Sequence, residues 1–385
     1  MSEKKIKIGL IGLGPIGALH IDNLTSGAVT GCELVCVCDT RKVENPKIEK
    51  LPFFGDVADM LANGGIDAVV IATPSFTHFN LAKQCLEAGK HVLVEKPLAL
   101  CSADALKLGE LAKQCGKQCA VMLNQRTTPI YMRLKQMVQN AEFGKIRRVS
   151  WNMTNWFRPQ IYYDMSIWRG LWKGEAGGVL INQAIHNIDA FAWIFGLPQT
   201  LRAWTKFGKY HNIEVEDEVT AYMEYPQDMT ATFITSSGEH PGTNRFEISG
   251  DKMYVVAENN ELRISKFEGE TSSEFTMNTL YAFGTPDTVE SVEKFEGKGA
   301  QHAGVLQNFA NACLGVEENR YGAEQGYISL ALANSMLLSG ITNKDVEFPF
   351  ADDAYAKILA ELQAKSELRK TVRKDFILDF NKSFR

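Results

Sequence analysis

Residues 9–20 read GLIGLGPIGALH, and this stretch decides the fold of the first part of the chain. Gly12, Gly14 and Gly17 have G-x-G-x-x-G spacing between an apolar run, IKIGLI, and a helical segment. The first glycine permits a tight turn, the second lets a pyrophosphate approach the backbone, and the third lets helix and strand pack closely. Pro15 suits the first turn of a helix. The context predicts a dinucleotide-binding turn, with an ordinary tight loop as the alternative.

Four further apolar runs follow the glycine turn and alternate with helical stretches such as SADALKLGELAKQCG (residues 102–116). Their near-continuous Val, Ile, Leu and Cys content indicates strands covered on both faces, hence a parallel sheet. Strand–helix–strand crossovers then predict a doubly wound Rossmann sheet. The runs are ELVCVCD (33–39), DAVVIAT (67–73), HVLVEK (91–96) and QCAVML (118–123).

Asp39 ends the second run, 22 residues beyond Gly17. A carboxylate at this place accepts hydrogen bonds from ribose hydroxyls and repels a 2′-phosphate. NAD is therefore favoured over NADP. Arg41, which would pair with a phosphate, leaves NADP as the less favoured alternative.

A length of 385 residues suits two domains. The composition, with 45% hydrophobic and 23% charged residues, is that of an ordinary globular protein. A net charge of -5 argues against a nucleic-acid partner. No apolar run approaches the ~20 residues of a membrane-spanning helix. The eight cysteines show no Cys-x-x-Cys pair, so we expect no metal site. They are scattered along the chain, which suits free thiols in a reducing compartment and hence a cytoplasmic location.

From Ile146 onward, runs with alternating polarity follow one another over short turns, as antiparallel sheets allow. The runs are IRRVSWNMTNW, TLRAWTKF, VTAYMEY, MTATFITSS, NRFEISG, MYVVAE and ELRISKF.

Four motifs in a fixed order resemble a known family: GLGPIG, ATP with a downstream histidine, EKP, and GGVLINQAIHNID. Together they are similar to those of the glucose–fructose oxidoreductase / inositol dehydrogenase family of NAD(P)-dependent sugar oxidoreductases. The resemblance implies a Rossmann domain (1–124), then a substrate-binding and oligomerisation α/β domain (125–350) with a large, open, mostly antiparallel sheet. A C-terminal helix and tail (351–385) would follow. It also implies a homo-oligomer: a dimer, tetramer or hexamer.

The EKP motif ends the apolar run VLV with Glu95, Lys96 and Pro97. Ligands of a doubly wound sheet bind beyond the carboxyl ends of its strands, where Lys96 is expected. An ammonium there would bind a sugar hydroxyl and stabilise the alkoxide that forms from it. The alternative is a surface lysine paired with Glu95. The resemblance implies the catalytic role.

The segment GGVLINQAIHNIDAFAWIFG (177–196) has helical spacing, so Asn182 and His186, four apart, are expected on one face of a helix. A histidine can take a hydroxyl proton at neutral pH, and Asp189 is near enough in sequence to orient it. A core histidine bonded to Asp189 is the alternative. The resemblance implies that His186 transfers the proton.

Asn182 departs from the aspartate of many family members. An amide cannot raise the basicity of a histidine as a carboxylate would, but it can bind substrate hydroxyls. The N-Q-x-x-H version resembles members that act on sugar nucleotides or glycosides, which weakens a simple inositol-dehydrogenase assignment.

Other candidates come from NQR (124–126), after the last Rossmann strand, and from an aromatic segment (155–178) that suits sugar rings, although tryptophans usually pack in cores. The resemblance places Trp168 and Arg169 near the cofactor. The expected cofactor-binding residues are Gly12, Gly14, Pro15, Ile16, Gly17, Asp39, Thr73, Pro74, His78, Glu95, Lys96, Asn124, Trp168 and Arg169. The expected substrate-binding residues are Asn124, Arg126, Tyr163, Asn182 and His186.

These observations predict an NAD-dependent oxidoreductase that moves hydride between a ring hydroxyl of a sugar, glycoside or cyclitol and nicotinamide, forming for instance a 3-keto sugar. Three alternatives stay open: an NAD-dependent glycosidase with a transient ketone and no net redox change, an inositol dehydrogenase, and a non-enzymatic dinucleotide sensor.

Overall fold

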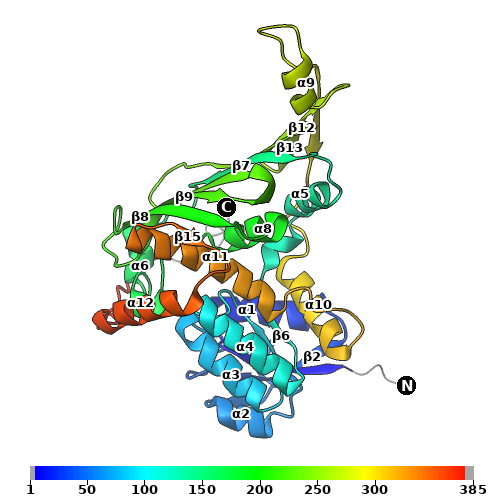
Figure 1. Cartoon of the computed structure of the whole chain (residues 1–385). Coiled ribbons are helices and arrows are strands. Elements are labelled where there is room, and N and C mark those ends of the chain that lie inside the picture. The colour runs from blue at the N-terminus through cyan, green and yellow to red at the C-terminus, as the bar shows by residue number, and fades with distance from the viewer. Residues whose placement is uncertain (1–4, 378–385) are drawn as a thin grey trace. The chain divides into compact units, whose positions relative to one another are not determined.

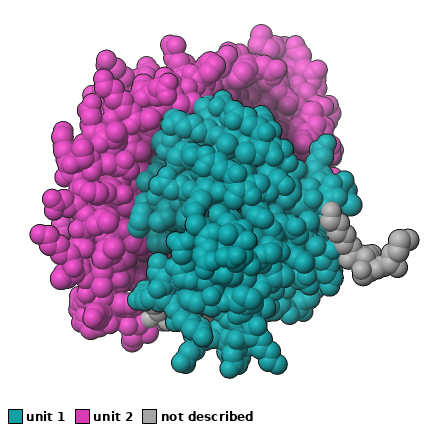
Figure 2. All heavy atoms as spheres, turned by 90° about the horizontal axis from the view of Figure 1, so that it is seen from below, with its two compact units in different colours: residues 1–127, 300–331 teal, residues 128–299, 332–385 magenta. Residues whose placement is uncertain are grey.

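The computed structural model describes residues 5–377 and divides the chain into two compact units. Unit 1 comprises residues 1–127 and 300–331, and unit 2 comprises residues 128–299 and 332–385 (Figure 2). Residues 378–385, the end of the expected C-terminal tail, lie outside the described residues.

Unit 1 contains a six-stranded sheet whose neighbouring strands all pair in parallel. The order β3-β2-β1-β4-β5-β6 is that of a dinucleotide-binding Rossmann sheet. The predicted doubly wound sheet is therefore confirmed. Its strands are β1 (Ile6–Ile11), β2 (Cys32–Cys38), β3 (Phe53–Phe54), β4 (Ala68–Ile71), β5 (His91–Val94) and β6 (Cys119–Val121).

Helices connect these strands, and α3 and α4 pack side by side (Figure 1). The helices of the N-terminal part are α1 (Pro15–Thr25), α2 (Val57–Asn63), α3 (His78–Glu87) and α4 (Ser102–Cys115), and short 3-10 helices are η1 (Ser75–Thr77) and η2 (Asn124–Thr127).

A late segment of the chain also belongs to unit 1. It contains α10 (Gln301–Leu314) and the start of α11 (Ala323–Thr342). The loop between these two helices pairs with β6. The backbone N–H of Val121 in β6 donates to the carbonyl of Tyr321 in the loop at 2.8 Å, beside a bridge between Ala120 and Gly322. The sequence division assigned this segment to the second domain, whereas it extends the edge of the Rossmann sheet next to β6.

Unit 2 is built on a nine-stranded sheet in the order β14-β13-β12-β11-β7-β10-β9-β8-β15. All neighbours pair antiparallel except β7 and β10, which are parallel, so the predicted mostly antiparallel sheet is confirmed. The strands are β7 (Ile146–Met153), β8 (Thr200–Phe207), β9 (Glu216–Glu224), β10 (Thr230–Ser236), β11 (Asn244–Gly250), β12 (Met253–Glu258), β13 (Glu261–Phe267), β14 (Thr288–Lys294) and β15 (Val346–Glu347).

One face of this sheet carries the core of unit 2. On β9, Val219, Ala221 and Met223 are buried and the residues between them are exposed. Helices on the buried side include α5 and α8, which pack against each other (Figure 1). The helices are α5 (Pro129–Gln139), α6 (Gln160–Asp164), α7 (Trp172–Glu175), α8 (Ile185–Phe195), α9 (Ser272–Asn278) and α12 (Asp352–Lys365), with the 3-10 helix η3 (Pro226–Asp228).

An aromatic cluster fixes α8 against the sheet. Trp151 of β7 stacks on Phe246 of β11 with ring centroids 4.2 Å apart, and Phe191 of α8 stacks within 6.4 Å of Trp151. All three side chains are at most 2% exposed. Such buried aromatic contacts stabilise a helix position by more than area alone. Within the described part of the chain, none of the helices has the length and apolarity to cross a bilayer.

Candidate functional site

The glycine turn between β1 and α1 has the three properties its spacing predicts. Gly12 has a φ of +95°, and a Cβ there would lie 2.5 Å from the carbonyl oxygen of Ala72. A Cβ on Gly17 would lie 2.1 Å from the carbonyl oxygen of Gly12. By contrast, a Cβ on Gly14 would meet no atom within 4 Å. The backbone at Gly14, directly before Pro15 at the start of α1, therefore faces open space, as the approach of a phosphate group to the backbone requires.

The Asp39 carboxylate lies beside this turn, directly after β2. Its Oδ2 accepts a hydrogen bond from the backbone N–H of Leu13 at 2.7 Å, and its Oδ1 accepts one from the N–H of Arg41 at 3.1 Å. These bonds fix the carboxylate at the carboxyl ends of the strands, where a nucleotide ribose lies in Rossmann domains.

His78 joins the loops that follow β4 and β5. The ring is 1% exposed, with Nδ1 2.7 Å from the carbonyl oxygen of Pro97 and Nε2 2.9 Å from that of Thr73. Burial lowers the pKa of His78, and the two facing carbonyl groups oppose this shift. His78 thus lies between two loops that carry predicted cofactor residues, and a neutral ring with one N–H donates to only one of the two carbonyls. Its own contact with the cofactor stays a prediction.

Glu95 lies in a buried cluster with two histidines. Its Oε1 is 2.8 Å from Nε2 of His20 and 3.5 Å from Nε2 of His302, and its Oε2 accepts a bond from the backbone N–H of Lys96 at 3.3 Å. Burial alone would raise the pKa of Glu95, but the bonds from His20 and His302 hold it well below its usual range. The ionised, 8% exposed carboxylate therefore anchors the backbone that carries Lys96, which is itself half-buried between buried Glu95 and Pro97.

Asn124 follows β6 in η2 and is held by α10. Its Nδ2 donates to Oε1 of Gln301 at 2.6 Å, whereas its buried Oδ1 has no hydrogen-bond partner among the described residues. An unpartnered buried acceptor points to a ligand or water that completes it. Arg126 is 5% exposed and donates from Nη1 to Oε1 of Gln325 at 2.8 Å, so it is integrated into unit 1.

In unit 2, the predicted pair Asn182 and His186 is the accessible part of an otherwise buried segment. From residue 174 to residue 192, a stretch that is described throughout, only these two residues are not buried. Asp189 is 1% exposed. The segment thus presents one amide and one imidazole and little else to a ligand.

The prediction that Asn182 and His186 lie on one helix is wrong for Asn182. α8 begins at Ile185, and Asn182 lies in the turn before it. The Glu216 carboxylate accepts bonds from the backbone N–H groups of Gly178 at 2.8 Å and Leu180 at 2.9 Å, which fix the preceding loop. The N–H of Ala184 then bonds to the carbonyl of Val179, five residues back, which is not the α-helical register.

Burial raises the pKa of Glu216 to about 7, and this predicts a pH-dependent stability. Its carboxyl in the unfolded chain ionises near 4.5, so between these values the folded protein holds a proton that the unfolded chain has lost. The free energy of unfolding should therefore fall as the pH rises from 4.5 to 7, by roughly 2–3 kcal/mol. Glu216→Gln, which is neutral throughout, should flatten this dependence in denaturant titrations at pH 5, 6, 7 and 8. The exposed Glu224→Gln on the same strand is the control, and parallel curves for wild type and Glu216→Gln would contradict the prediction.

A buried carboxylate that the sequence did not single out contacts Asn182. Glu175, at the end of α7, is 2% exposed and accepts a hydrogen bond from Nδ2 of Asn182. The same Nδ2 lies 3.2 Å from the hydroxyl oxygen of Tyr162, which also accepts a bond from Nη1 of Arg169 at 2.7 Å. The available signal was an acid placed directly before the Ala-Gly-Gly that opens the His186 segment.

The other residues of the aromatic segment divide between this network and the core. The Arg169 guanidinium lies over the rings of Trp168, at 4.4 Å, and Tyr162, at 4.5 Å. Tyr163 is 1% exposed, its hydroxyl lies 3.1 Å from Oγ of Ser237, and burial raises its pKa. The structure thus places Tyr163 in the core of unit 2 and its neighbour Tyr162 against Asn182.

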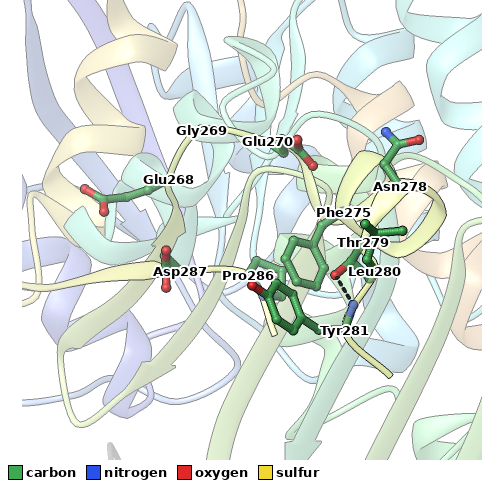
Figure 3. Close-up of a pocket in the computed structure, with 10 residues that line it drawn as sticks. All are labelled: Glu268, Gly269, Glu270, Phe275, Asn278, Thr279, Leu280, Tyr281, Pro286 and Asp287. Carbon is green, nitrogen blue, oxygen red and sulfur yellow. Dashed lines mark hydrogen bonds between the residues drawn. The ribbon is translucent and has the colours of Figure 1, made fainter. Parts of the chain in front are cut away.

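A pocket of about 620 Å³ lies elsewhere in unit 2, around α9 and the segment that leads into β14 (Figure 3). The predicted site residues are not among those that line it, which are Glu268, Gly269, Glu270, Phe275, Asn278, Thr279, Leu280, Tyr281, Pro286 and Asp287. Among the described residues, no group of three or more His, Cys, Asp or Glu side chains is placed to hold a metal ion.

The strand order, the glycine turn and Asp39 define a dinucleotide-binding protein of the Rossmann class. The family model for oxidoreductases with an NAD-binding Rossmann fold matches residues 6–123, and the model for the GFO/IDH/MocA C-terminal domain matches residues 131–256. The chain belongs to the Gfo/Idh/MocA family of oxidoreductases, which confirms the resemblance read from its motifs.

Relatives of this chain include the scyllo-inositol 2-dehydrogenase (NAD(+)) of Bacillus subtilis, 30% identical over 202 residues, which are 50% of this chain and 55% of that protein. The chain thus spans about half the length of this curated relative. Among solved structures, the WlbA dehydrogenase of Chromobacterium violaceum in complex with NADH and UDP-GlcNAcA is 28% identical. The match covers 91% of this chain and 97% of the WlbA chain, with a TM-score of 0.76. The Bordetella pertussis WlbA dehydrogenase, with the same ligands, is 28% identical over 90% and 100%, with a TM-score of 0.73.

Proposed function

We propose that this protein is an NAD-dependent oxidoreductase that transfers hydride between a ring hydroxyl of a sugar, glycoside or cyclitol and nicotinamide. The observation that carries the proposal is the exposure of Asn182 and His186 alone in a buried segment. An imidazole beside an amide suits proton transfer from a hydroxyl that is also held by a hydrogen bond. The names of the relatives, which concern inositols and a UDP-sugar, support this substrate class.

The residues of unit 1 fit a bound dinucleotide. Gly14 leaves room for the pyrophosphate, Asp39 would accept bonds from the ribose, and the buried Oδ1 of Asn124 would accept one from an amide or hydroxyl. NAD, when bound, supplies the hydride acceptor. We favour NAD over NADP because the Asp39 carboxylate repels a 2′-phosphate.

Each proposed catalytic residue has one task. Lys96 stabilises the negative charge that develops on the reacting oxygen. His186 takes the proton from the hydroxyl oxygen, and the hydride leaves the carbon that bears this oxygen. An alcohol thereby becomes a ketone, and NADH and one proton are released. Among substrates we favour a sugar or glycoside oxidised to a 3-keto sugar, in a cytoplasmic homo-oligomer.

The test is a substrate screen with the purified full chain. Myo-inositol, scyllo-inositol, methyl glucosides and UDP-GlcNAcA are each incubated with NAD or NADP, NADH or NADPH is followed by absorbance, and products are identified by mass. We expect reduction of NAD in preference to NADP, with a product two hydrogens lighter. Release of free sugar without net NADH would indicate a glycosidase instead, and no turnover of any polyol would support a dinucleotide sensor.

A further inference from the structure

Three segments of unit 1 meet at the Glu95 carboxylate, in the loop that follows β5. His20 approaches from α1 and His302 from the start of α10, with their Nε2 atoms 2.8 and 3.5 Å from the same Oε1. The two rings pack edge to face with centroids 5.7 Å apart, and His20 is fully buried. The other oxygen, Oε2, accepts the backbone N–H of Lys96 at 3.3 Å. The lysine backbone is thus bonded to a carboxylate that two histidines contact.

The two histidines also keep Glu95 in the form that can accept all of these bonds. Their bonds hold the pKa of Glu95 well below its usual range, although burial alone would raise it. Nδ1 of His20 has no hydrogen-bond partner among the described residues, so the contact with Glu95 fixes a hydrogen on Nε2. Without these donors, burial would favour a protonated carboxyl, which accepts the N–H of Lys96 more weakly than a carboxylate does.

The backbone at the start of α10 is strained where it brings His302 to Glu95. Gln301, directly before His302, has a φ of +46°, which residues other than glycine rarely adopt. Its backbone N–H donates to Oγ1 of Thr127 at 2.7 Å, and its side-chain Oε1 accepts from Nδ2 of Asn124 at 2.6 Å. Two consecutive residues therefore bond to the segment after β6 and the loop after β5. Strain that surrounding contacts maintain is concentrated at functional sites.

We propose that His20 and His302 are positioning residues that act through Glu95 to fix the backbone of Lys96, so that the start of α10 belongs to the catalytic site of unit 1. This inference rests on the proposed function, in which Lys96 stabilises the developing negative charge. Their task is to hold Glu95 ionised and in one orientation. A fixed backbone keeps the ammonium in place while the charge develops.

The contact between His20 and Glu95 is tested by thermal unfolding of the full chain, without any assay of turnover. His20→Leu leaves Glu95 without its shortest bond, and Glu95→Met leaves His20 without its acceptor, so each midpoint should fall. The double variant leaves neither group of this pair unpaired, and we expect its midpoint about 2–6 °C above that from the summed single shifts. His91→Leu combined with Glu95→Met is the matched control and should be additive, because His91 lies at the start of β5 and accepts the backbone N–H of Gln118 instead.

The positioning role is tested by the pH dependence of kcat with NAD and myo-inositol or UDP-GlcNAcA. In His20→Leu and His302→Leu, burial is less opposed, so the pKa of Glu95 should rise and the carboxyl should take up a proton as the pH falls. We expect kcat relative to wild type to be about 10- to 100-fold lower at pH 6 and to recover toward pH 9, with the KM for NAD unchanged. The other charged or titratable groups near Glu95, Lys96 and His78, are the same in variant and wild type.

Conservative variants separate this role from a structural one. His20→Gln and His302→Gln keep an N–H donor near the position of Nε2, so they should restore most of kcat and its wild-type pH dependence. A merely structural role would lower kcat by the same factor at every pH, as we expect for His91→Leu if it has any effect. His302 is less deeply buried than His20, so His302→Leu carries the test if His20→Leu does not fold.

The outcomes separate this inference from the proposed function. Wild-type turnover with an additive His20/Glu95 pair, or with a loss of kcat that does not change with pH, overturns the inference alone. A wild type that oxidises no polyol overturns the proposed function, and the inference falls with it. Non-additive stability together with a pH-dependent loss of kcat that the glutamine variants relieve supports the inference.

Discussion

Lys96→Ala is expected to lower NADH formation by about 10³-fold while NAD binding stays nearly unchanged. The reason is the location of Lys96 two residues beyond the end of β5, on backbone that Glu95 anchors through the 3.3 Å bond to its N–H. Removing a preorganised group that stabilises a developing oxyanion typically costs 10²–10³-fold in kcat. Steady-state kinetics with a polyol from the screen measure the first quantity, and calorimetric titration with NAD measures the second.

Lys83→Ala provides the control for this experiment. Lys83 is a half-exposed lysine of α3 in an ion pair with Glu87 at 2.5 Å, so its loss removes a positive charge from the same unit without touching the EKP loop. Turnover in Lys96→Ala equal to that in Lys83→Ala would remove Lys96 from the mechanism. A loss of NAD affinity that matches the loss of turnover would make Lys96 a cofactor-binding residue only.

The parts of this fold that the sequence predicts are those whose signals are local. Continuous apolar runs predicted five of the six parallel strands of unit 1, and alternation predicted seven of the nine strands of unit 2. β3 was not predicted because it has two residues, too few to form a recognisable apolar run. β14 was not predicted because its residues are almost all exposed, so TVESVEK shows no alternation of apolar and polar positions.

The parts of the site that the sequence did not predict depend on distant contacts. The loop that precedes α8 is bonded to Glu216, 38 positions after Gly178. Glu95 and His20 meet across 75 positions, and their contact joins α1 to the loop that follows β5. Residues 300–331 join unit 1 through backbone pairing next to β6, which leaves no mark in composition. Glu175 is close to Asn182 in sequence, but only the turn between them brings their side chains together.

Two substitutions in the glycine turn should have opposite effects on folding and binding. Gly14→Ala is expected to fold with nearly wild-type stability, because Gly14 has a φ of -66° that any residue adopts and its Cβ would meet no atom within 4 Å. The new methyl group would instead occupy the space that a pyrophosphate needs for contact with the backbone. We expect NAD affinity to fall at least about tenfold, or 1.4 kcal/mol, in calorimetric titration.

Gly17→Ala is the matched partner of this variant, with the same added atom three positions later. Its Cβ would lie 2.1 Å from the carbonyl oxygen of Gly12, an overlap that side-chain rotation cannot relieve because the obstacle is backbone. The helix must move away from β1, which should cost about 3 kcal/mol of unfolding free energy and lower the unfolding midpoint. Normal NAD affinity in Gly14→Ala would show that the dinucleotide does not approach the backbone there, even if the Gly17 variant unfolds as expected.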